Sequence, residues 1–174
     1  MSTNIYNPRY TMEDAQYAIT NLVEIFDYLG LGDPFGAGRA REAILANFLG
    51  HTLGDDLQGA DAYDNSGNIY EYKTTLASCG VSGRYDVSTQ PTWQDQVDYL
   101  RENKIANNAY HYYATFTPKM ELVSVFEIDG DTVLDLLIPK LHKKFFQDKT
   151  NLKVQGLHAT LSAKDIRTFG NKLK

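Results

Sequence analysis

The stretch of this chain that most constrains its fold is GADAYDNSGNIYEYKTT, residues 59–75. Asn, Ser and Gly at its centre suit a tight turn, and the residues that follow alternate as those of a strand do. The stretch therefore predicts a β-hairpin over residues 61–76. Because side chains two positions apart in a strand share a face, Glu71 and Lys73 are expected on one face and Tyr72 on the other.

The hairpin also gathers three side chains that could perform chemistry. A bend near Gly67 brings Asp61 alongside Glu71, and two carboxylates at close range repel unless a proton or a cation lies between them. Oxygen ligands at a partly hydrated site suit Mg²⁺ or Mn²⁺, and the amine of Lys73 could position a water. Asp, Glu and Lys around a divalent ion are typical of phosphodiester hydrolysis. The alternative is a surface hairpin on which Glu71 and Lys73 form an ordinary ion pair.

Length and composition indicate one globular domain. The chain has 174 residues, of which 43% are hydrophobic, enough for one core and too few for two full domains. Its apolar runs are too short to cross a membrane, and its first residues lack the apolar core of a signal peptide. Cys79 is the single cysteine, so an intrachain disulfide is excluded. We expect a cytoplasmic protein with no membrane association.

Charge is distributed unevenly along the chain. Residues 1–135 carry 8 Lys or Arg against 20 Asp or Glu, whereas residues 136–174 carry 9 against 2. A basic carboxyl-terminal segment could steer a polyanion to one face, and a solvated lysine-rich helix is the alternative. The lysines that could contact phosphate are Lys140, Lys143, Lys144, Lys149 and Lys153.

Helical and strand patterns alternate along the chain, which predicts an α/β fold with a central mixed β-sheet flanked by helices. Capping residues and periodicity predict helices from Thr11 to about Leu29, from about Gly38 to 49, and after Thr92 and Ser162. Strands are expected at NAYHYYATF, at ELVSVFEID and finally at LHATL. Residues 77–91 are expected to form an irregular loop or short ribbon. In the helix from Asp131, Pro139 should break the helix or open a second segment.

Several side chains are assigned to the core by their spacing. Residues expected to face inward on the second helix are Ala40, Ile44, Leu45, Phe48 and Leu49. Aromatic residues expected to pack in the core are Trp93, Tyr99, Tyr110, Tyr112 and Phe116. Asp64 is explained by a turn hydrogen bond, Asp55 and Asp56 by solvated loop charges, and the four histidines by ordinary structural roles.

The segment DAYDNSGNIYEYK contains Asp61, Glu71 and Lys73. It resembles the active-site segment of PvuII-like type II restriction endonucleases, which belong to the PD-(D/E)xK nuclease superfamily. The resemblance covers about residues 30–75, where GLGDPF and the following helix keep the same spacing to Asp61. Beyond that range only the order of elements agrees.

The resemblance implies a restriction-endonuclease-like fold over residues 1–174, with a helical dimerisation region at 1–35 and a catalytic and DNA-recognition region at 36–174. It implies that Asp61, Glu71 and the Tyr72 carbonyl bind Mg²⁺, for which Mn²⁺ substitutes, and that Lys73 orients the attacking water. The implied activity is sequence-specific hydrolysis of double-stranded DNA by a prokaryotic homodimer, leaving 5′-phosphate ends.

Two positions and one segment depart from the family pattern. Ala60 stands where the signature has Pro. Ala37 stands where the family has an Asp that contacts the minor groove, and residues 77–90 lack the histidine cluster of the family's recognition ribbon. The target sequence is therefore not transferred with the chemistry.

The segment that follows the catalytic strand is the best candidate for reading bases, because Arg suits guanine and Gln suits adenine in the major groove. The candidate DNA-binding residues are Ser82, Arg84, Asp86, Ser88 and Gln90. An ordinary polar loop is the alternative. For the whole chain, the alternatives to a restriction enzyme are a junction resolvase or DNA-repair nuclease with the same signature, and a non-catalytic DNA-binding domain.

Overall fold

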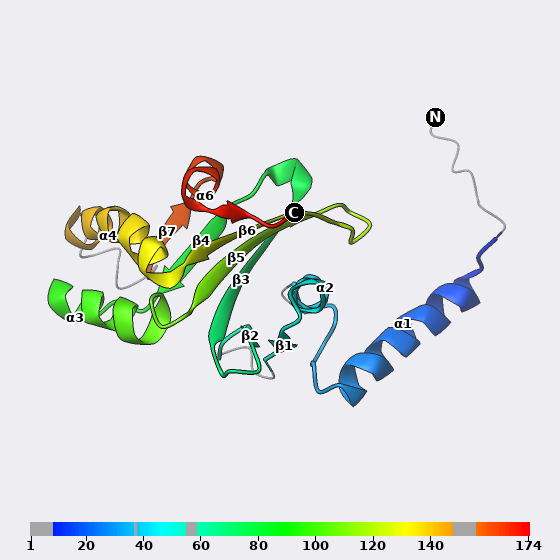
Figure 1. Cartoon of the computed structure of the whole chain (residues 1–174). Coiled ribbons are helices and arrows are strands. Elements are labelled where there is room, and N and C mark those ends of the chain that lie inside the picture. The colour runs from blue at the N-terminus through cyan, green and yellow to red at the C-terminus, as the bar shows by residue number, and fades with distance from the viewer. Residues whose placement is uncertain (1–8, 37, 55–58, 148–155) are drawn as a thin grey trace. The chain divides into compact units, whose positions relative to one another are not determined.

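The computed structural model describes residues 9–36, 38–54, 59–147 and 156–174 (Figure 1). The chain forms two compact units, Met1–Ala40 and Arg41–Lys174. The helices are α1 (Met12–Tyr28), α2 (Arg39–Leu49), α3 (Trp93–Tyr99), α4 (Gly130–Gln147) and α6 (Ala163–Phe169). The strands are β1 (Thr52–Leu53), β2 (Ala62–Tyr63), β3 (Ile69–Leu76), β4 (Gly83–Val87), β5 (Tyr110–Phe116), β6 (Leu122–Asp129), β7 (Leu157–Leu161) and β8 (Asn171–Lys172).

Helix α1 begins at the predicted capping box. Thr11 accepts a hydrogen bond from the backbone N–H of Asp14, and the Asp14 carboxylate accepts one from the backbone N–H of Thr11 at 2.7 Å. Gly30, with φ of 68°, follows the last turn in the left-handed conformation that glycine adopts without strain. Phe26 is the one residue of α1 that is buried, so most of this helix's apolar surface is exposed.

The central sheet is mixed and six-stranded, with the order β1-β2-β3-β5-β6-β8. Strands β3 and β5 run parallel, with Glu71 beside His111 and Lys73 beside Tyr113, and the other neighbours are antiparallel. The chain between β3 and β5 contains β4 and α3, and it continues from α3 through a π-helical turn at Leu100–Lys104. The predicted mixed sheet of an α/β fold is confirmed.

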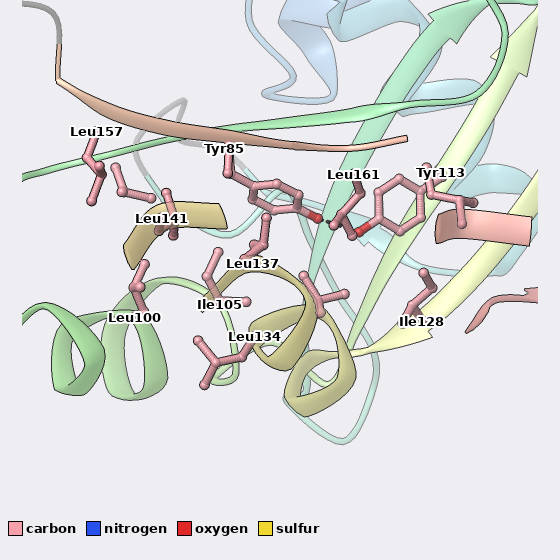
Figure 2. Close-up of a cluster of buried hydrophobic side chains, with 14 of the residues drawn as sticks. Tyr85, Leu100, Ile105, Tyr113, Ile128, Leu134, Leu137, Leu141, Leu157 and Leu161 are labelled. Carbon is pink, nitrogen blue, oxygen red and sulfur yellow. Dashed lines mark hydrogen bonds between the residues drawn. The ribbon is translucent and has the colours of Figure 1, made fainter. Parts of the chain in front are cut away.

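Strands β4 and β7 form a separate antiparallel ribbon, which lies beside α4 and α6 in Figure 1. Of the two alternatives for residues 77–91, the short ribbon is confirmed: Gly83, Tyr85 and Val87 are buried, while the residues between them face solvent. The main core fills the space among this ribbon, α4 and the sheet (Figure 2). Its fully buried members include Leu100, Ile105, Leu137, Leu141, Leu157 and Leu161.

Two predictions about element boundaries are wrong. Helix α4 continues through Pro139. Pro139 and Asp135, whose carbonyl loses its helical donor to the proline, are both exposed, so water can satisfy that carbonyl. LHATL is not the last strand, because β8 follows α6 and pairs with β6. LHATL forms β7, which lies outside the central sheet because it pairs with β4. The predicted caps at Thr92 and Ser162 are confirmed.

Two predicted core residues are instead exposed. Phe48 is 43% exposed, and its ring lies 5.7 Å from Nζ of Lys174. Ala46 is buried beside Leu45, so the inward face of α2 is rotated from the predicted one. Tyr110 is 41% exposed because it begins β5, at the rim of the sheet. Within the described part of the chain, no helix is both long and apolar enough to span a bilayer.

Candidate active site

The turn between β2 and β3 is held by Asp64, as predicted. Its carboxylate accepts hydrogen bonds from the backbone N–H groups of Ser66 at 2.8 Å and Asn68 at 2.9 Å, and from the Tyr70 hydroxyl at 2.7 Å. Gly67 lies inside this turn with φ of 82°. The hydrogen bonds to Asn68 and Tyr70 hold the pKa of Asp64 well below its usual value. Asp64 is therefore a structural residue of the turn.

Asp61 is fixed in place by both of its backbone groups. Its N–H donates to the Tyr70 carbonyl at 3.1 Å, and its carbonyl accepts from the N–H of Gly54 at 2.9 Å. The next residue, Ala62, pairs with Tyr70, so the antiparallel register continued by one position places Asp61 opposite Glu71. The hairpin register thus places the two acids opposite each other, and the negative charge of Glu71 acts on Asp61.

Asp61 comes directly before β2, and its side chain reaches the edge of β3. Its Oδ2 accepts a hydrogen bond from the backbone N–H of Tyr72 at 2.6 Å. The N–H and C=O of one residue in a strand point to the same edge, so the Tyr72 carbonyl faces the side on which Asp61 lies. Asp61, Glu71 and this carbonyl offer oxygen atoms at one corner of the hairpin.

Lys73 is paired with Glu71, its neighbour two positions earlier on the same face of β3. Its Nζ donates to Oε1 of Glu71, and the same Nζ lies 5.0 Å from the centre of the Tyr85 ring. Glu71 is buried, and the Lys73 side chain is 23% exposed. The amine therefore lies at the boundary between the core and solvent, where it can reach a bound molecule.

The electrostatics of the two acids differ. Burial, followed by the negative charge of Glu71, raises the pKa of Asp61 to about 7. Burial alone would raise the pKa of Glu71 as well, but the charge and hydrogen bond of Lys73 outweigh it, and the net pKa is lowered. Lys73 thus compensates the charge of Glu71, while the charge of Asp61 lacks equal compensation.

The opposite face of β3 is held by an aromatic cluster. The His51 ring stacks on Tyr70 with centroids 4.1 Å apart, and its Nδ1 shares a hydrogen bond of 2.8 Å with the Tyr72 hydroxyl. Tyr112 of β5 packs edge-on against both tyrosines. This packing fixes the backbone of β3 from behind, so the carboxylates on the front face have a rigid base. His51 is a structural histidine, as predicted.

The donor set fits a divalent cation. A cation between Asp61 and Glu71 would favour the charged form of Asp61, whose burial beside another acid otherwise opposes ionisation. Hard oxygen donors and room for water are what Mg²⁺ prefers. Among the described residues, no group of three or more His, Cys, Asp or Glu side chains is arranged to hold a metal. The candidate site would therefore use two carboxylates, the Tyr72 carbonyl and water.

The candidate base-reading residues lie on and beside β4. Arg84 and Asp86 face outward from the ribbon, across from Thr160 and His158 of β7. The Arg84 guanidinium is paired with the Asp86 carboxylate at 2.8 Å, and both side chains are 61% exposed.

The other candidate residues flank this strand. Ser88 is exposed just after β4, and Ser82 is half-buried just before it. Gln90 lies beyond the strand, where its backbone N–H donates to Oε1 of Gln96 at 2.9 Å. Arg84, Asp86 and Ser88 are therefore all exposed on β4 or just after it, and the half-buried Gln90 lies next to Ser88, whose carbonyl accepts from its Nε2 at 3.5 Å.

The predicted phosphate-contacting lysines have different environments. Nζ of Lys140 is paired with Asp165 at 2.6 Å and donates to the Thr160 carbonyl at 2.9 Å. Lys143 and Lys144 are on α4. Lys149 and Lys153 lie outside the described residues, as do Ala37, Asp55 and Asp56.

Residues close to the site that the sequence did not single out come from other elements. Glu42 of α2 adds negative charge that further raises the pKa of Asp61. His111 and Tyr113 are the register partners of Glu71 and Lys73 on β5, so they lie on the same face of the sheet, and the Tyr85 ring lies beside Lys73. The alternation of uncharged and charged residues in GRYDV was the available signal that Tyr85 faces inward. Nothing in the neighbouring sequence indicates that Tyr85 contacts Lys73.

The chain matches no protein-family model and no curated protein sequence.

Proposed function

We propose that this chain is a type II restriction endonuclease, a Mg²⁺-dependent enzyme that hydrolyses phosphodiester bonds of double-stranded DNA at a specific sequence and leaves 5′-phosphate ends. The observation that carries the proposal is the convergence of Asp61 and Glu71 at one corner of the hairpin, with Lys73 paired to Glu71. The resemblance of residues 30–75 to PvuII-like members of the PD-(D/E)xK superfamily supports the same function.

Each residue has a defined role in this proposal. Asp61, Glu71 and the Tyr72 carbonyl would hold Mg²⁺, and Mn²⁺ would substitute. The ion would supply Lewis acidity at the scissile phosphate. Lys73, at the solvent boundary, would orient the water that attacks phosphorus in line with the leaving 3′ oxygen. A surface ion pair between Glu71 and Lys73 would need neither a buried Glu71 nor a second, half-buried carboxylate opposite it, so the arrangement favours this assignment.

The β4–β7 ribbon is the proposed element for base reading. A two-stranded ribbon fits the major groove of B-DNA, and Arg84 is the side chain best suited to guanine. In the free protein Arg84 is paired with Asp86. Because both side chains are well exposed, that pair is weak enough to be exchanged for contacts to a base.

The proposed enzyme is a homodimer that acts in the prokaryotic cytoplasm. Each chain has one candidate centre, whereas a duplex has two strands to cut, and a two-fold protein suits a palindromic site. Helix α1 supports a partner surface within residues 1–35, because apolar side chains cover much of its exterior. The exposed apolar residues of this helix include Met12, Tyr17, Ile19, Val23, Ile25 and Tyr28.

Digestion of one plasmid of known sequence tests the proposal. Purified protein with Mg²⁺ should give discrete fragments whose mapped ends share one sequence and carry 5′-phosphates. Chelation of the metal should stop the reaction. Smeared products, or cutting confined to branched DNA, would instead favour the resolvase or repair nuclease. DNA binding without cleavage in Mg²⁺ or Mn²⁺ at every protein concentration would favour the non-catalytic binding domain.

A further inference from the structure

A chain of buried hydrogen bonds lies beside Glu71 and Lys73, on the same face of the sheet. The Tyr85 hydroxyl is 2.6 Å from the Tyr113 hydroxyl and 3.0 Å from Nδ1 of His111, and Nε2 of His111 is 3.0 Å from the Ile105 carbonyl oxygen. Figure 2 shows the hydroxyls of Tyr85 and Tyr113 directed toward each other within the core. All three side chains are almost fully buried.

The direction of each hydrogen bond in this chain follows from one carbonyl. The Ile105 oxygen can only accept, so Nε2 of His111 carries a proton. Burial lowers the pKa of His111 to about 4, so the ring is neutral at pH 7 and its Nδ1 accepts. The Tyr85 hydroxyl must then donate to His111, and the Tyr85 oxygen accepts from the Tyr113 hydroxyl. The hydroxyl of Tyr85 is therefore held from two sides.

The ring of Tyr85 faces Lys73. Strand β4 approaches β3 closely at Gly83, where an added methyl group would lie 3.3 Å from Cγ of Lys73 and would overlap the Tyr113 ring. This approach brings the Tyr85 ring centre to 5.0 Å from Nζ of Lys73, within the range of a cation–π interaction. A lysine side chain has four flexible carbons, so without a second contact its amine would sample many positions around Glu71.

We infer that Tyr85 is a positioning residue, whose ring holds the Lys73 ammonium beside Glu71 while the hydrogen-bond chain from Tyr113 to Ile105 fixes the ring. This inference rests on the proposed function, because the held amine is the group that would orient water. Tyr85 itself touches neither DNA nor metal in this arrangement. Its contribution acts through Lys73 alone.

Three substitutions at this position separate the ring from its hydroxyl. Tyr85→Phe keeps the ring and removes the hydroxyl, whereas Tyr85→Leu removes both. Replacement of Tyr85 by a trifluorinated phenylalanine keeps the size of the phenylalanine ring but weakens its negative face. Val87→Ala is the matched control, because Val87 is another inward-facing residue of β4, two positions beyond Tyr85, and it belongs to the same core.

Cleavage is measured under single-turnover conditions with saturating protein, and DNA affinity is measured with Ca²⁺ in place of Mg²⁺. We expect Tyr85→Leu to cleave about 5- to 30-fold more slowly than wild type, the factor that corresponds to losing one cation–π contact. DNA affinity should not change. Val87→Ala should stay within about 3-fold of wild type, whereas Tyr85→Phe, which keeps the ring but loses the hydrogen bonds that fix it, should fall between wild type and Tyr85→Leu. Both variants lose thermal stability. A cleavage rate that follows stability across all variants would overturn the inference.

The fluorinated variant decides the matter if Tyr85→Leu does not fold. It should cleave more slowly than Tyr85→Phe at nearly equal stability, and equal rates would contradict a role for the ring face.

A second readout does not require nuclease activity. Acetylation of Lys73 by acetic anhydride, followed by mass spectrometry, should be faster in the Leu and trifluorinated variants than in Tyr85→Phe. That result supports positioning even if the wild-type protein cuts no DNA, in which case the proposed function alone fails. Equal acetylation in all variants would show that the ring does not hold the amine.

Discussion

Asp61 and Tyr72 are joined across the hairpin: the backbone N–H of Tyr72 donates to Oδ2 of Asp61 at 2.6 Å. This hydrogen bond aims the carboxylate of one strand at the edge of the other, next to the Tyr72 carbonyl. It stabilises the charged form of Asp61, but the burial and the neighbouring Glu71 oppose that form more strongly. In the proposed enzyme, a bound cation would compensate the charge of this acid.

The substitution Asp61→Asn tests that role with little change in shape. The amide oxygen of Asn can still accept from the Tyr72 N–H, so the hairpin should fold, but the negative charge is lost. We expect Mg²⁺-dependent cleavage to fall by roughly 10- to 100-fold or more. The measurement is a plasmid cleavage assay across a Mg²⁺ titration, with circular dichroism as the folding control. If Asp61→Asn cleaves at the wild-type rate at low Mg²⁺, Asp61 does not bind the metal.

Glu71→Ala and Lys73→Ala should each abolish cleavage and spare DNA binding. Glu71 would hold the metal and Lys73 would orient the water, and neither role is needed to contact the duplex. Binding is followed by fluorescence anisotropy with Ca²⁺, and cleavage by gel electrophoresis with Mg²⁺. A Lys73→Ala protein that cleaves normally would contradict the assignment.

Arg84→Ala should weaken binding to the recognised sequence more than to other DNA. An arginine that reads guanine contributes about 1–3 kcal/mol of discrimination, a factor of roughly 5 to 150. Stability should change by less than about 0.5 kcal/mol, because the Arg84–Asp86 pair is well exposed. Lys143→Ala is the contrasting variant, since a phosphate contact would weaken binding to all sequences alike. Equal loss on specific and unrelated duplexes would place Arg84 outside base reading.

Gly83→Ala should destabilise the fold by about 1–3 kcal/mol, the usual cost of overpacking. The added methyl group would overlap the Tyr113 ring and press against the stem of Lys73, which lies 3.3 Å away. Urea denaturation measures the loss. The adjacent, half-buried Ser82 offers the control Ser82→Ala, which should stay within about 0.5 kcal/mol of wild type. Equal stability of the two variants would mean that β4 does not approach β3 this closely.

His111 should make the protein sensitive to mild acid. Its pKa is lowered by burial from 6.5 to about 4, so the unfolded chain binds the proton more readily than the folded one. The contribution to stability is complete above pH 6.5 and is lost as the pH falls toward 4, by roughly 2–3 kcal/mol.

The comparison with His111→Gln isolates this effect, because glutamine can donate and accept but does not titrate. Urea denaturation at several pH values should show the stability advantage of wild type over this variant shrinking between pH 6.5 and pH 4. Carboxylates elsewhere titrate in both proteins, so their effects largely cancel in the difference. A constant difference across that range would contradict the buried, neutral state of His111.

The sequence alone determined the features that depend on neighbours within a few residues. The Thr11 and Ser162 capping boxes, the Asp64 turn and the shared face of Glu71 and Lys73 are all present, because each is set by local hydrogen bonds or by strand alternation. The pairing of Asp61 with Glu71 was predictable for the same reason, since a tight hairpin fixes its own register.

Tertiary structure decided what lies behind and around that hairpin. Helix α4 continues through Pro139, and Phe48 and Tyr110 are exposed. Each of these outcomes depends on which side of the element faces solvent. Tyr85 and Lys73 meet because β4 leaves the central sheet to pair with β7, a strand about 70 residues further along the chain. No local pattern encodes such a partner, because its position is selected by the packing of the whole core.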